Sequence, residues 1–192
     1  MLVAPDRVLT ATHCLSRDER SAPRDPSRFV FAPGWPWNGP GALFGAADVT
    51  LPEARTLLGG ALPFDVALVR LDRPVPPLVA EPLPLTEGDG GGGDMASSAL
   101  TAIAYPNGAP DTPLAERACR IVLEEGDVIG IDCASKPGFS GGAVLAGPAG
   151  GWRLRAVIVA QSRRPAPAGA AGAAATYAVR PAENLRRALT EP

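Results

Sequence analysis

The sequence predicts an all-β protein built from two β-rich halves, and three observations support this prediction. Short apolar runs rich in Val, Ile and Leu recur along the chain with turn residues between them, as in proteins made of many short strands. Apolar residues with helical spacing appear only near the end. Residues 86–98, TEGDGGGGDMASS, contain four consecutive glycines and no apolar pattern, so they predict a flexible linker between residues 1–85 and residues 99–192.

Ten runs are expected to form strands, and their ends are defined by Gly, Pro and polar residues. Those before the linker are Arg7–Thr10, Phe29–Phe31, Ala42–Gly45 and Val66–Leu71. Those after it are Ala99–Ala104, Ala118–Leu123, Val128–Ile131, Gly142–Leu145, Trp152–Ala160 and Thr176–Val179. Residues 162–175 are low in complexity and predict a solvent-exposed loop. Residues 182–190 predict a short packing helix, because Pro181 suits a helix start and Leu185 and Leu189 share one face.

Composition argues against several classes of function. The chain has 192 residues, 46% of them hydrophobic, and a formal net charge of −2, with no basic cluster dense enough for nucleic acid. No apolar run reaches the roughly 18–20 residues that cross a bilayer, and the given chain begins with no signal peptide pattern. The three cysteines and one histidine form no CxxC or HxxxH pair, so we expect no metal site.

The segment CASKPGFSGGAVL places Ser140 among glycines, as either a nucleophile or a turn residue. A serine hydroxyl attacks a carbonyl only when a base removes its proton, and the single histidine of the chain, His13, is the one candidate. GFSGG also fits the GxSxG pattern of α/β-hydrolases, but there the histidine follows the serine, and here none does. The order in this chain places histidine first and serine last.

Asp65 is the best candidate for the acid that orients the histidine. It begins the run DVALVRL and so stands at the head of an apolar strand, where a carboxylate can be buried beside His13. Asp6, Asp48 and Asp72 are its competitors, but no comparable apolar run follows any of them.

The segments TATHC, DVALV and GFSGGA, in this order, resemble the His, Asp and Ser motifs of the chymotrypsin-like (trypsin-fold) serine peptidases. Residues 103–108, IAYPNG, are similar to a GYP strand end of bacterial members. The resemblance implies two packed six-stranded antiparallel Greek-key β-barrels with a short C-terminal helix, the first barrel being incomplete because only twelve residues precede His13. It also implies that His13 is the general base and acid, Asp65 its orienting partner and Ser140 the nucleophile, with no cofactor.

The same resemblance implies an oxyanion hole and a specificity pocket. The amides of Gly138 and Ser140 are expected to bind the oxyanion. The residues expected to bind the substrate side chain are Ala134, Lys136, Ile158, Val159 and Ala160. Ala134 stands where specificity for Lys or Arg needs an aspartate, so cleavage after basic residues is disfavoured. Lys136 could attract an acidic side chain, but Ile158 lies near the place of a histidine found in glutamate-specific members, and a small or medium apolar side chain is therefore expected.

Cys119 and Cys133 are 14 positions apart and flank two predicted strands and the Ser140 loop. The expected arrangement is one disulfide between them and a leftover thiol at Cys14, with two free thiols as the alternative. Cys14 resembles a family cysteine whose partner lies upstream. Phe139 stands where activatable animal members have an aspartate that pairs with a new N-terminus, so no such activation is expected.

These observations predict a monomeric serine endopeptidase, secreted or periplasmic, that acts on protein or peptide substrates without Lys/Arg specificity. Nucleic acid and membranes are not expected partners. The first alternative is a catalytically inactive, truncated protease-fold module that binds peptides. A second alternative is an esterase that uses the same acyl-transfer site.

Overall fold

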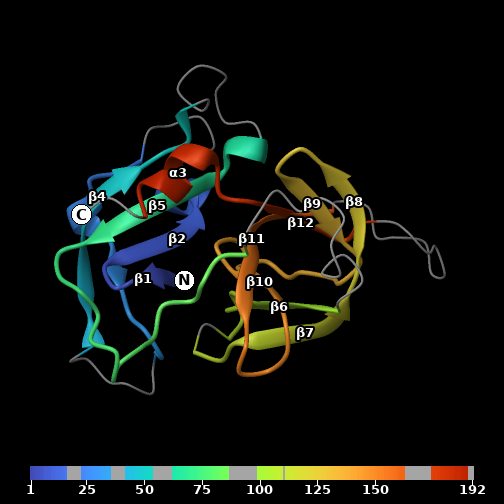
Figure 1. Cartoon of the computed structure of the whole chain (residues 1–192), viewed down its shortest axis with the longest axis horizontal. Helices are drawn as coiled ribbons and strands as arrows, with labels where there is room; N and C mark the ends of the chain where they lie inside the picture. The colour runs from blue at the N-terminus through green and yellow to red at the C-terminus, as the bar shows by residue number, and fades with distance from the viewer. Residues whose placement is uncertain are drawn as a thin grey trace.

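The computed structural model describes residues 1–16, 23–35, 42–53, 62–86, 99–109, 111–162 and 174–189. In this part of the chain, two curled antiparallel sheets of five and seven strands pack side by side (Figure 1). They confirm the predicted all-β fold. Residues 87–98 of the predicted linker and 163–173 of the predicted loop lie outside the described residues.

The first sheet has the strand order β1-β2-β5-β4-β3. Its strands are Leu2–Ala4 (β1), Arg7–Ala11 (β2), Val30–Phe31 (β3), Phe44–Thr50 (β4) and Val66–Leu71 (β5). β1 was not among the predicted strands, because three residues are too few to show a period. A tight turn at Pro5 and Asp6 joins β1 to β2, and these residue types are typical of such turns.

The second sheet has the strand order β7-β6-β10-β11-β12-β9-β8. Its strands are Leu100–Ala104 (β6), Leu114–Cys119 (β7), Ile121–Glu125 (β8), Val128–Ile131 (β9), Ala143–Ala146 (β10), Arg153–Gln161 (β11) and Thr176–Val179 (β12). The predicted strand 118–123 is two strands. The chain bends at Ala118, whose φ is +59°, so that β7 pairs with β6 while β8 pairs with β9. Apolar residues lie on both sides of Arg120, and their pattern gave no sign of the bend.

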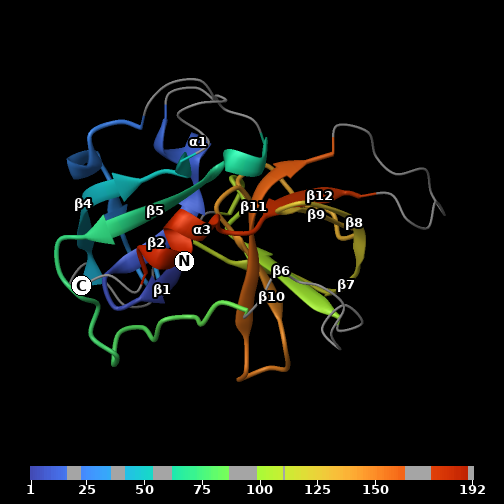
Figure 2. The same cartoon turned by 45° about the horizontal axis from the view of Figure 1, so that its top comes forward.

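The described part of the chain includes two short α-helices, α1 and α3, beside the sheets. Thr12–Leu15 (α1) continues directly from β2, and Glu183–Arg187 (α3) is shorter than the predicted helix 182–190. Leu185 is fully buried, and the Asn184 side-chain amide donates a 2.9 Å hydrogen bond to the carbonyl of Leu51. The C-terminal helix therefore returns to the first sheet, beside β2 and β5, although it follows the last strand of the second (Figure 2). No helix in the described segments is long and apolar enough to span a membrane.

Three hydrophobic clusters form the core. One fills the first sheet around Phe44 and Val69, and one fills the second sheet around Phe139 and Ile129. The third joins the sheets: Leu9, Leu68 and other residues of the first sheet pack against Val157, Val179 and other residues of the second, together with Leu185 of α3. This shared core fixes the ends of β2 and β5 against β10 and β11, where the candidate site lies.

Candidate active site

His13 and Asp65 meet because their strands are neighbours in the first sheet. Ala11, the last residue of β2, pairs with Val66, the first residue of β5. His13, two residues after the end of β2, therefore lies beside Asp65, directly before β5, although 52 positions separate the two in sequence.

Asp65 holds α1 and the imidazole ring at the same time. The Asp65 carbonyl accepts the Thr12 N–H at 3.2 Å, and Asp65 Oδ1 accepts the His13 N–H at 2.9 Å. Asp65 Oδ2 lies 2.5 Å from His13 Nδ1. The backbone carbonyl and the carboxylate of Asp65 thus each satisfy one amide that the helix start leaves unpaired, and the carboxylate fixes the ring with Nδ1 as the donor. Nε2 is then the nitrogen that can accept a proton.

Burial and charge give this pair its electrostatics. Asp65 is buried, with 9% of its surface exposed, whereas 28% of the His13 side chain is accessible. The Asp65 carboxylate raises the pKa of His13 above its ordinary value, chiefly through the hydrogen bond to Nδ1 and against the opposing effect of burial. The pair therefore stabilises the imidazolium that forms when His13 accepts a proton.

Ser140 lies in a tight loop between β9 and β10. Phe139 is buried in the core of the second sheet and anchors the loop, and its N–H donates to the Lys136 carbonyl at 3.0 Å. The Gly141 N–H donates to the Ile158 carbonyl at 2.8 Å, which ties the loop to β11. Phe139 thus serves as an apolar anchor for the loop.

Two backbone amides of this loop are available to a ligand. Within the described residues, the N–H groups of Gly138 and Ser140 donate no hydrogen bond. Gly138 has a φ of +96°, and a Cβ there would lie 2.5 Å from the backbone nitrogen of Asn107. Both the positive φ and the lack of space for a Cβ therefore favour glycine at this position.

The loop reaches the first sheet beside the histidine. Gly141 approaches Thr10 so closely that a Cβ would lie 2.6 Å from Thr10 Oγ1, and Thr10 is three residues before His13. Among the described residues, no hydrogen bond joins the side chains of His13 and Ser140. Contacts of this kind are often long in a ligand-free site and shorten when substrate binds.

A pocket of about 130 Å³ opens beside Ser140. Residues 135–140 form one wall, and Ile158, Ala160 and Gln161 of β11 form the other. Lys136, Ile158 and Ala160 were expected here. Val159 is buried in the core between the sheets, because successive side chains of a strand point to opposite faces.

Ala134 is exposed and does not line this pocket, whereas the neighbouring Ser135 does. Ser135 and Gln161 were not among the residues expected to bind substrate. Each is next in sequence to a residue that was expected there. The alternation of side chains along β11 excludes Val159 from the pocket, but it does not by itself place Gln161 in the pocket.

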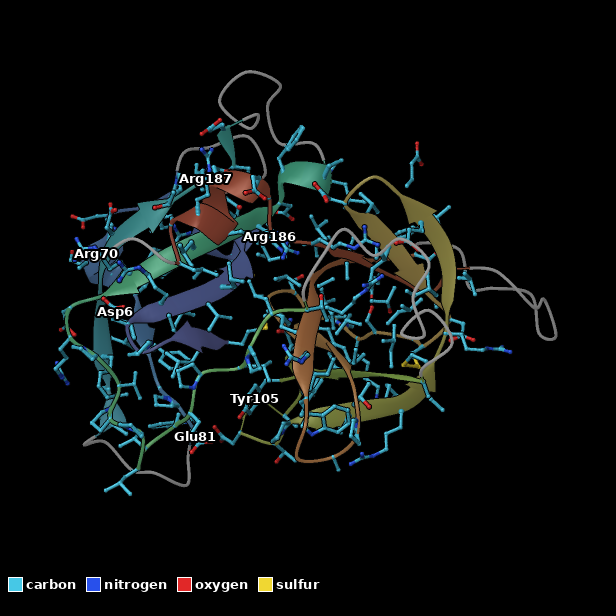
Figure 3. All side chains as sticks on the ribbon, in the orientation of Figure 1. Asp6, Arg70, Glu81, Tyr105, Arg186 and Arg187 are labelled. Carbon is cyan, nitrogen blue, oxygen red and sulfur yellow. A yellow bond between two sulfur atoms is a disulfide. The ribbon has the colours of Figure 1, made fainter. Side chains whose placement is uncertain are left out.

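A larger cavity of about 530 Å³, lined by residues of both halves, also reaches Ser140. Gly138 and Ser140 line both cavities. Apolar residues of both halves also line the larger one. Glu81 and Tyr105 contribute to its wall, and Figure 3 labels both in the lower part of the molecule.

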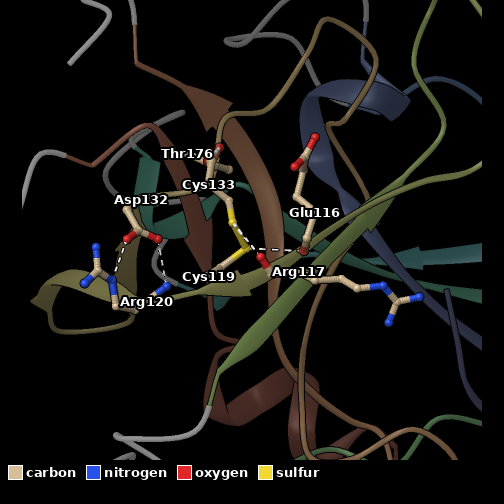
Figure 4. The surroundings of a disulfide bond; sticks show 7 residues. All are labelled: Glu116, Arg117, Cys119, Arg120, Asp132, Cys133 and Thr176. Carbon is tan, nitrogen blue, oxygen red and sulfur yellow. Dashed lines mark hydrogen bonds and ion pairs between the residues drawn. A yellow bond between two sulfur atoms is a disulfide. The ribbon is translucent and has the colours of Figure 1, made fainter. Parts of the chain in front are cut away.

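Cys119 and Cys133 form the expected disulfide (Figure 4). It joins the end of β7 to the segment that leads from β9 into the Ser140 loop. Asp132 forms an ion pair with Arg120 at 2.8 Å, and Thr176 Oγ1 donates to the Cys133 carbonyl at 2.7 Å, so the segment is held on three sides. Cys14 is a free, exposed thiol.

Nothing in the described residues resembles a metal site, since no group of three or more His, Cys, Asp or Glu side chains could hold an ion. What the arrangement offers is a buried acid, an oriented imidazole, a serine in a tight loop and two unpaired amides. This set is suited to acyl transfer.

Comparisons with solved structures agree with this fold. The chain is similar to a Glu endopeptidase in complex with MPD, at 16% identity and a TM-score of 0.68, covering 97% of this chain and 80% of the other. It is also similar to the thermostable serine protease AL20 from an extremophilic microorganism, at 19% identity and a TM-score of 0.69, covering 93% and 81%. Protease Anisep from Arthrobacter nicotinovorans matches at 15% identity and a TM-score of 0.62, covering 93% and 79%.

No curated protein sequence matches the chain significantly. The family model of the trypsin-like peptidase domain, however, matches residues 1–151, which include all three motifs around His13, Asp65 and Ser140. With the two packed antiparallel sheets of that fold in place, the conclusion is that the chain belongs to the trypsin-like peptidase domain family.

Proposed function

We propose that this protein is a serine endopeptidase that hydrolyses peptide bonds through His13, Asp65 and Ser140 and an acyl-enzyme intermediate. Family and fold support peptidase activity on protein or peptide substrates. The main observation in support of the proposed triad is that the Asp65 carboxylate contacts both the backbone N–H and the ring Nδ1 of His13, the only histidine of the chain. A merely structural histidine has no need of both contacts.

In the first half of the reaction, His13 Nε2 takes the proton of Ser140 Oγ as that oxygen bonds to the scissile carbonyl carbon. The carbonyl oxygen becomes an oxyanion and accepts hydrogen bonds from the N–H groups of Gly138 and Ser140. Asp65 stabilises the imidazolium without taking its proton. His13 then gives the proton to the leaving nitrogen, the C–N bond breaks, and an ester to Ser140 is left.

In the second half, a water molecule takes the place of the leaving amine. His13 removes a proton from the water as its oxygen attacks the ester carbonyl, and the same two amides bind the second oxyanion. The proton returns to Ser140 Oγ as the C–O bond breaks. The net reaction consumes one water and yields a carboxylic acid and an amine, with every group of the protein restored.

Two further features support the proposal. No acidic side chain is found among the described residues that line the 130 Å³ pocket, so a substrate Lys or Arg has no counter-charge there. We therefore propose an enzyme that is not Arg/Lys-specific. The Cys119–Cys133 disulfide favours an oxidising compartment, so we propose a secreted or periplasmic monomer.

Labelling with a fluorophosphonate, followed by intact-mass analysis and peptide mapping, tests this function. We expect a single adduct on Ser140, no adduct in Ser140→Ala, and unchanged labelling in Ser27→Ala, which alters an exposed serine outside both cavities. With a peptide substrate, Ser140→Ala is expected to lower kcat by roughly a million-fold.

The same assays separate the alternatives. An inactive peptide-binding module would give a folded protein, by its circular dichroism spectrum, that neither labels nor cleaves. An esterase would label at Ser140 and cleave a nitrophenyl ester, yet leave the matched amide intact. Either result would overturn the endopeptidase proposal.

A further inference from the structure

The 130 Å³ pocket is suited to the substrate side chain on the acyl side of the scissile bond, an inference that rests on the proposed function. The attacked carbonyl must lie about 3 Å from Ser140 Oγ and from the oxyanion donors. Gly138 and Ser140, which supply these groups, also line the pocket. The side chain attached next to that carbonyl therefore has this pocket within reach.

An unpartnered hydroxyl lies in the wall of the pocket. Ser135 Oγ is buried, and it has no hydrogen-bond partner among the residues that the structure describes. Buried polar groups are nearly always hydrogen-bonded, because an unmade bond is costly. A substrate atom that accepts a hydrogen bond would satisfy this hydroxyl, whereas an apolar side chain would leave it unpaired.

The charge at the pocket is positive. Lys136 is the only lysine of the chain, it is exposed, and it is the one ionisable side chain in the described lining. Gln161 adds an amide that can also donate. These groups together offer donors and a cation to the occupant, which favours a carboxylate over a neutral acceptor and disfavours a cation.

The size of the pocket limits the choice further. The pocket, at about 130 Å³, is smaller than the cavity of about 530 Å³ that also reaches Ser140. That space can hold a side chain of the size of glutamate or aspartate. Phe139 and Ile158, which are buried, contribute apolar surface to its lining.

We propose that this pocket selects an acidic residue, glutamate or aspartate, on the acyl side of the scissile bond, with Ser135 and Lys136 as the specificity-determining residues. This differs from the small or medium apolar side chain expected from the sequence. The difference arises because Ser135, which the sequence analysis did not select, lines the pocket while Ala134 and Val159 do not.

The test compares kcat/KM for four peptides that differ only in the residue before the scissile bond: Glu, Gln, Leu and Arg. The Glu peptide is expected to exceed the Gln and Leu peptides by about tenfold or more, and the Arg peptide to be the poorest. High salt should reduce the Glu-over-Gln ratio, because Lys136 is exposed and its charge is screened. A Leu or Arg peptide that equals or exceeds the Glu peptide would overturn the proposal.

Variants then assign the selectivity to its residues. Ser135→Ala should lower kcat/KM for the Glu peptide about tenfold while leaving the Leu peptide within about twofold. Lys136→Gln should lower the Glu-over-Gln ratio, and Lys136→Arg, which keeps the charge, should restore it. Equal losses on the Glu and Leu peptides in Ser135→Ala would indicate a purely structural role and would contradict the assignment.

Fluorophosphonate labelling distinguishes failure of this inference from failure of the proposed function. If folded protein gave no adduct at Ser140, both the proposed function and the proposed acidic selectivity would be wrong. If Ser140 labels but none of the four peptides is cleaved, peptidyl aldehydes ending in Glu or Leu serve as competitors for labelling. Stronger protection by the Glu aldehyde would support acidic selectivity, and equal or weaker protection would overturn it.

Discussion

At the scale of single residues, the feature that matters most is the carboxylate of Asp65, which holds both the backbone amide and the ring of His13. An amide in place of the carboxylate keeps the size of the side chain but can donate to Nδ1, which permits the wrong imidazole tautomer. Replacing Asp65 by Asn therefore tests the effect of its charge while the size of the side chain stays the same.

Asp65→Asn is expected to lower kcat by about 10⁴ with little change in the folded structure. Steady-state kinetics on one peptide measure the loss, and a circular dichroism spectrum checks the fold. Asp48→Asn is the matched control, since Asp48 is an exposed residue of β4, and its activity should equal that of the parent. A loss below tenfold in Asp65→Asn would remove Asp65 from the proposed triad.

The pH profile provides a second prediction at this scale. Because only neutral His13 accepts a proton, kcat/KM should rise as pH rises through the pKa of His13, which Asp65 holds above 6.5. In Asp65→Asn, the residual activity should rise at a lower pH, since the carboxylate is gone. An unshifted profile would contradict the role assigned to Asp65.

The same pKa shift affects stability with a defined sign. A folded pKa above the unfolded value means that the folded state binds the proton more tightly. The His13–Asp65 pair therefore contributes stability that is fully present below about pH 6.5 and is lost as pH rises through the folded pKa. Activity and this part of the stability thus change in opposite directions over that range.

At the scale of elements, the loop between β9 and β10 determines whether the two unpaired amides are available. Gly138→Ala should lower kcat by about 10² to 10³, because φ is +96° and the new Cβ would meet the backbone of Asn107. Gly108→Ala is the control from the adjacent loop, where a Cβ meets no atom within 4 Å. Parallel kinetics on both variants check the prediction, and a fully active Gly138→Ala would contradict the proposed oxyanion hole.

The disulfide stabilises the same element from its N-terminal side. Replacing Cys119 and Cys133 together by Ala should lower the free energy of unfolding by about 3 kcal/mol, as expected for a bridge that spans 14 positions. Urea unfolding measures this value. Cys14→Ala, at the exposed free thiol, should change it by less than about 0.5 kcal/mol. Equal effects in the two variants would show that the bridge adds no stability.

At the scale of the whole molecule, the site depends on the packing of one sheet against the other. Leu185 of α3 is fully buried in the core that both sheets share. Leu185→Ala should lower the free energy of unfolding by about 2–5 kcal/mol, and activity should be lost at a correspondingly lower temperature. Leu78→Ala, at a fully exposed leucine, should behave as the parent does. Urea unfolding and heat inactivation check both, and a neutral Leu185→Ala would mean that α3 does not support the junction.

Sequence patterns could predict much of this molecule because the relevant signals are local. Alternating apolar runs and turn residues predicted most strands, and three short motifs in a fixed order were enough to indicate the family. Short or bent elements were missed. β1 is too short to show a period, and the predicted strand 118–123 spans the junction of β7 and β8, where the positive φ of Ala118 has no signature in the residue types.

The all-β class, the two halves, the pairing expected for Cys119 and Cys133, and the candidate residues His13, Asp65 and Ser140 all follow from the amino-acid sequence. Two features emerge only in three dimensions: the Asp65 carboxylate caps α1 while it orients the ring, and Ser135 rather than Ala134 lines the pocket. The spacing of apolar residues that predicts a strand involves residues close together in the chain, so it can be seen directly in the sequence. Which side chains enclose a cavity depends instead on the register and packing of strands that are far apart in sequence.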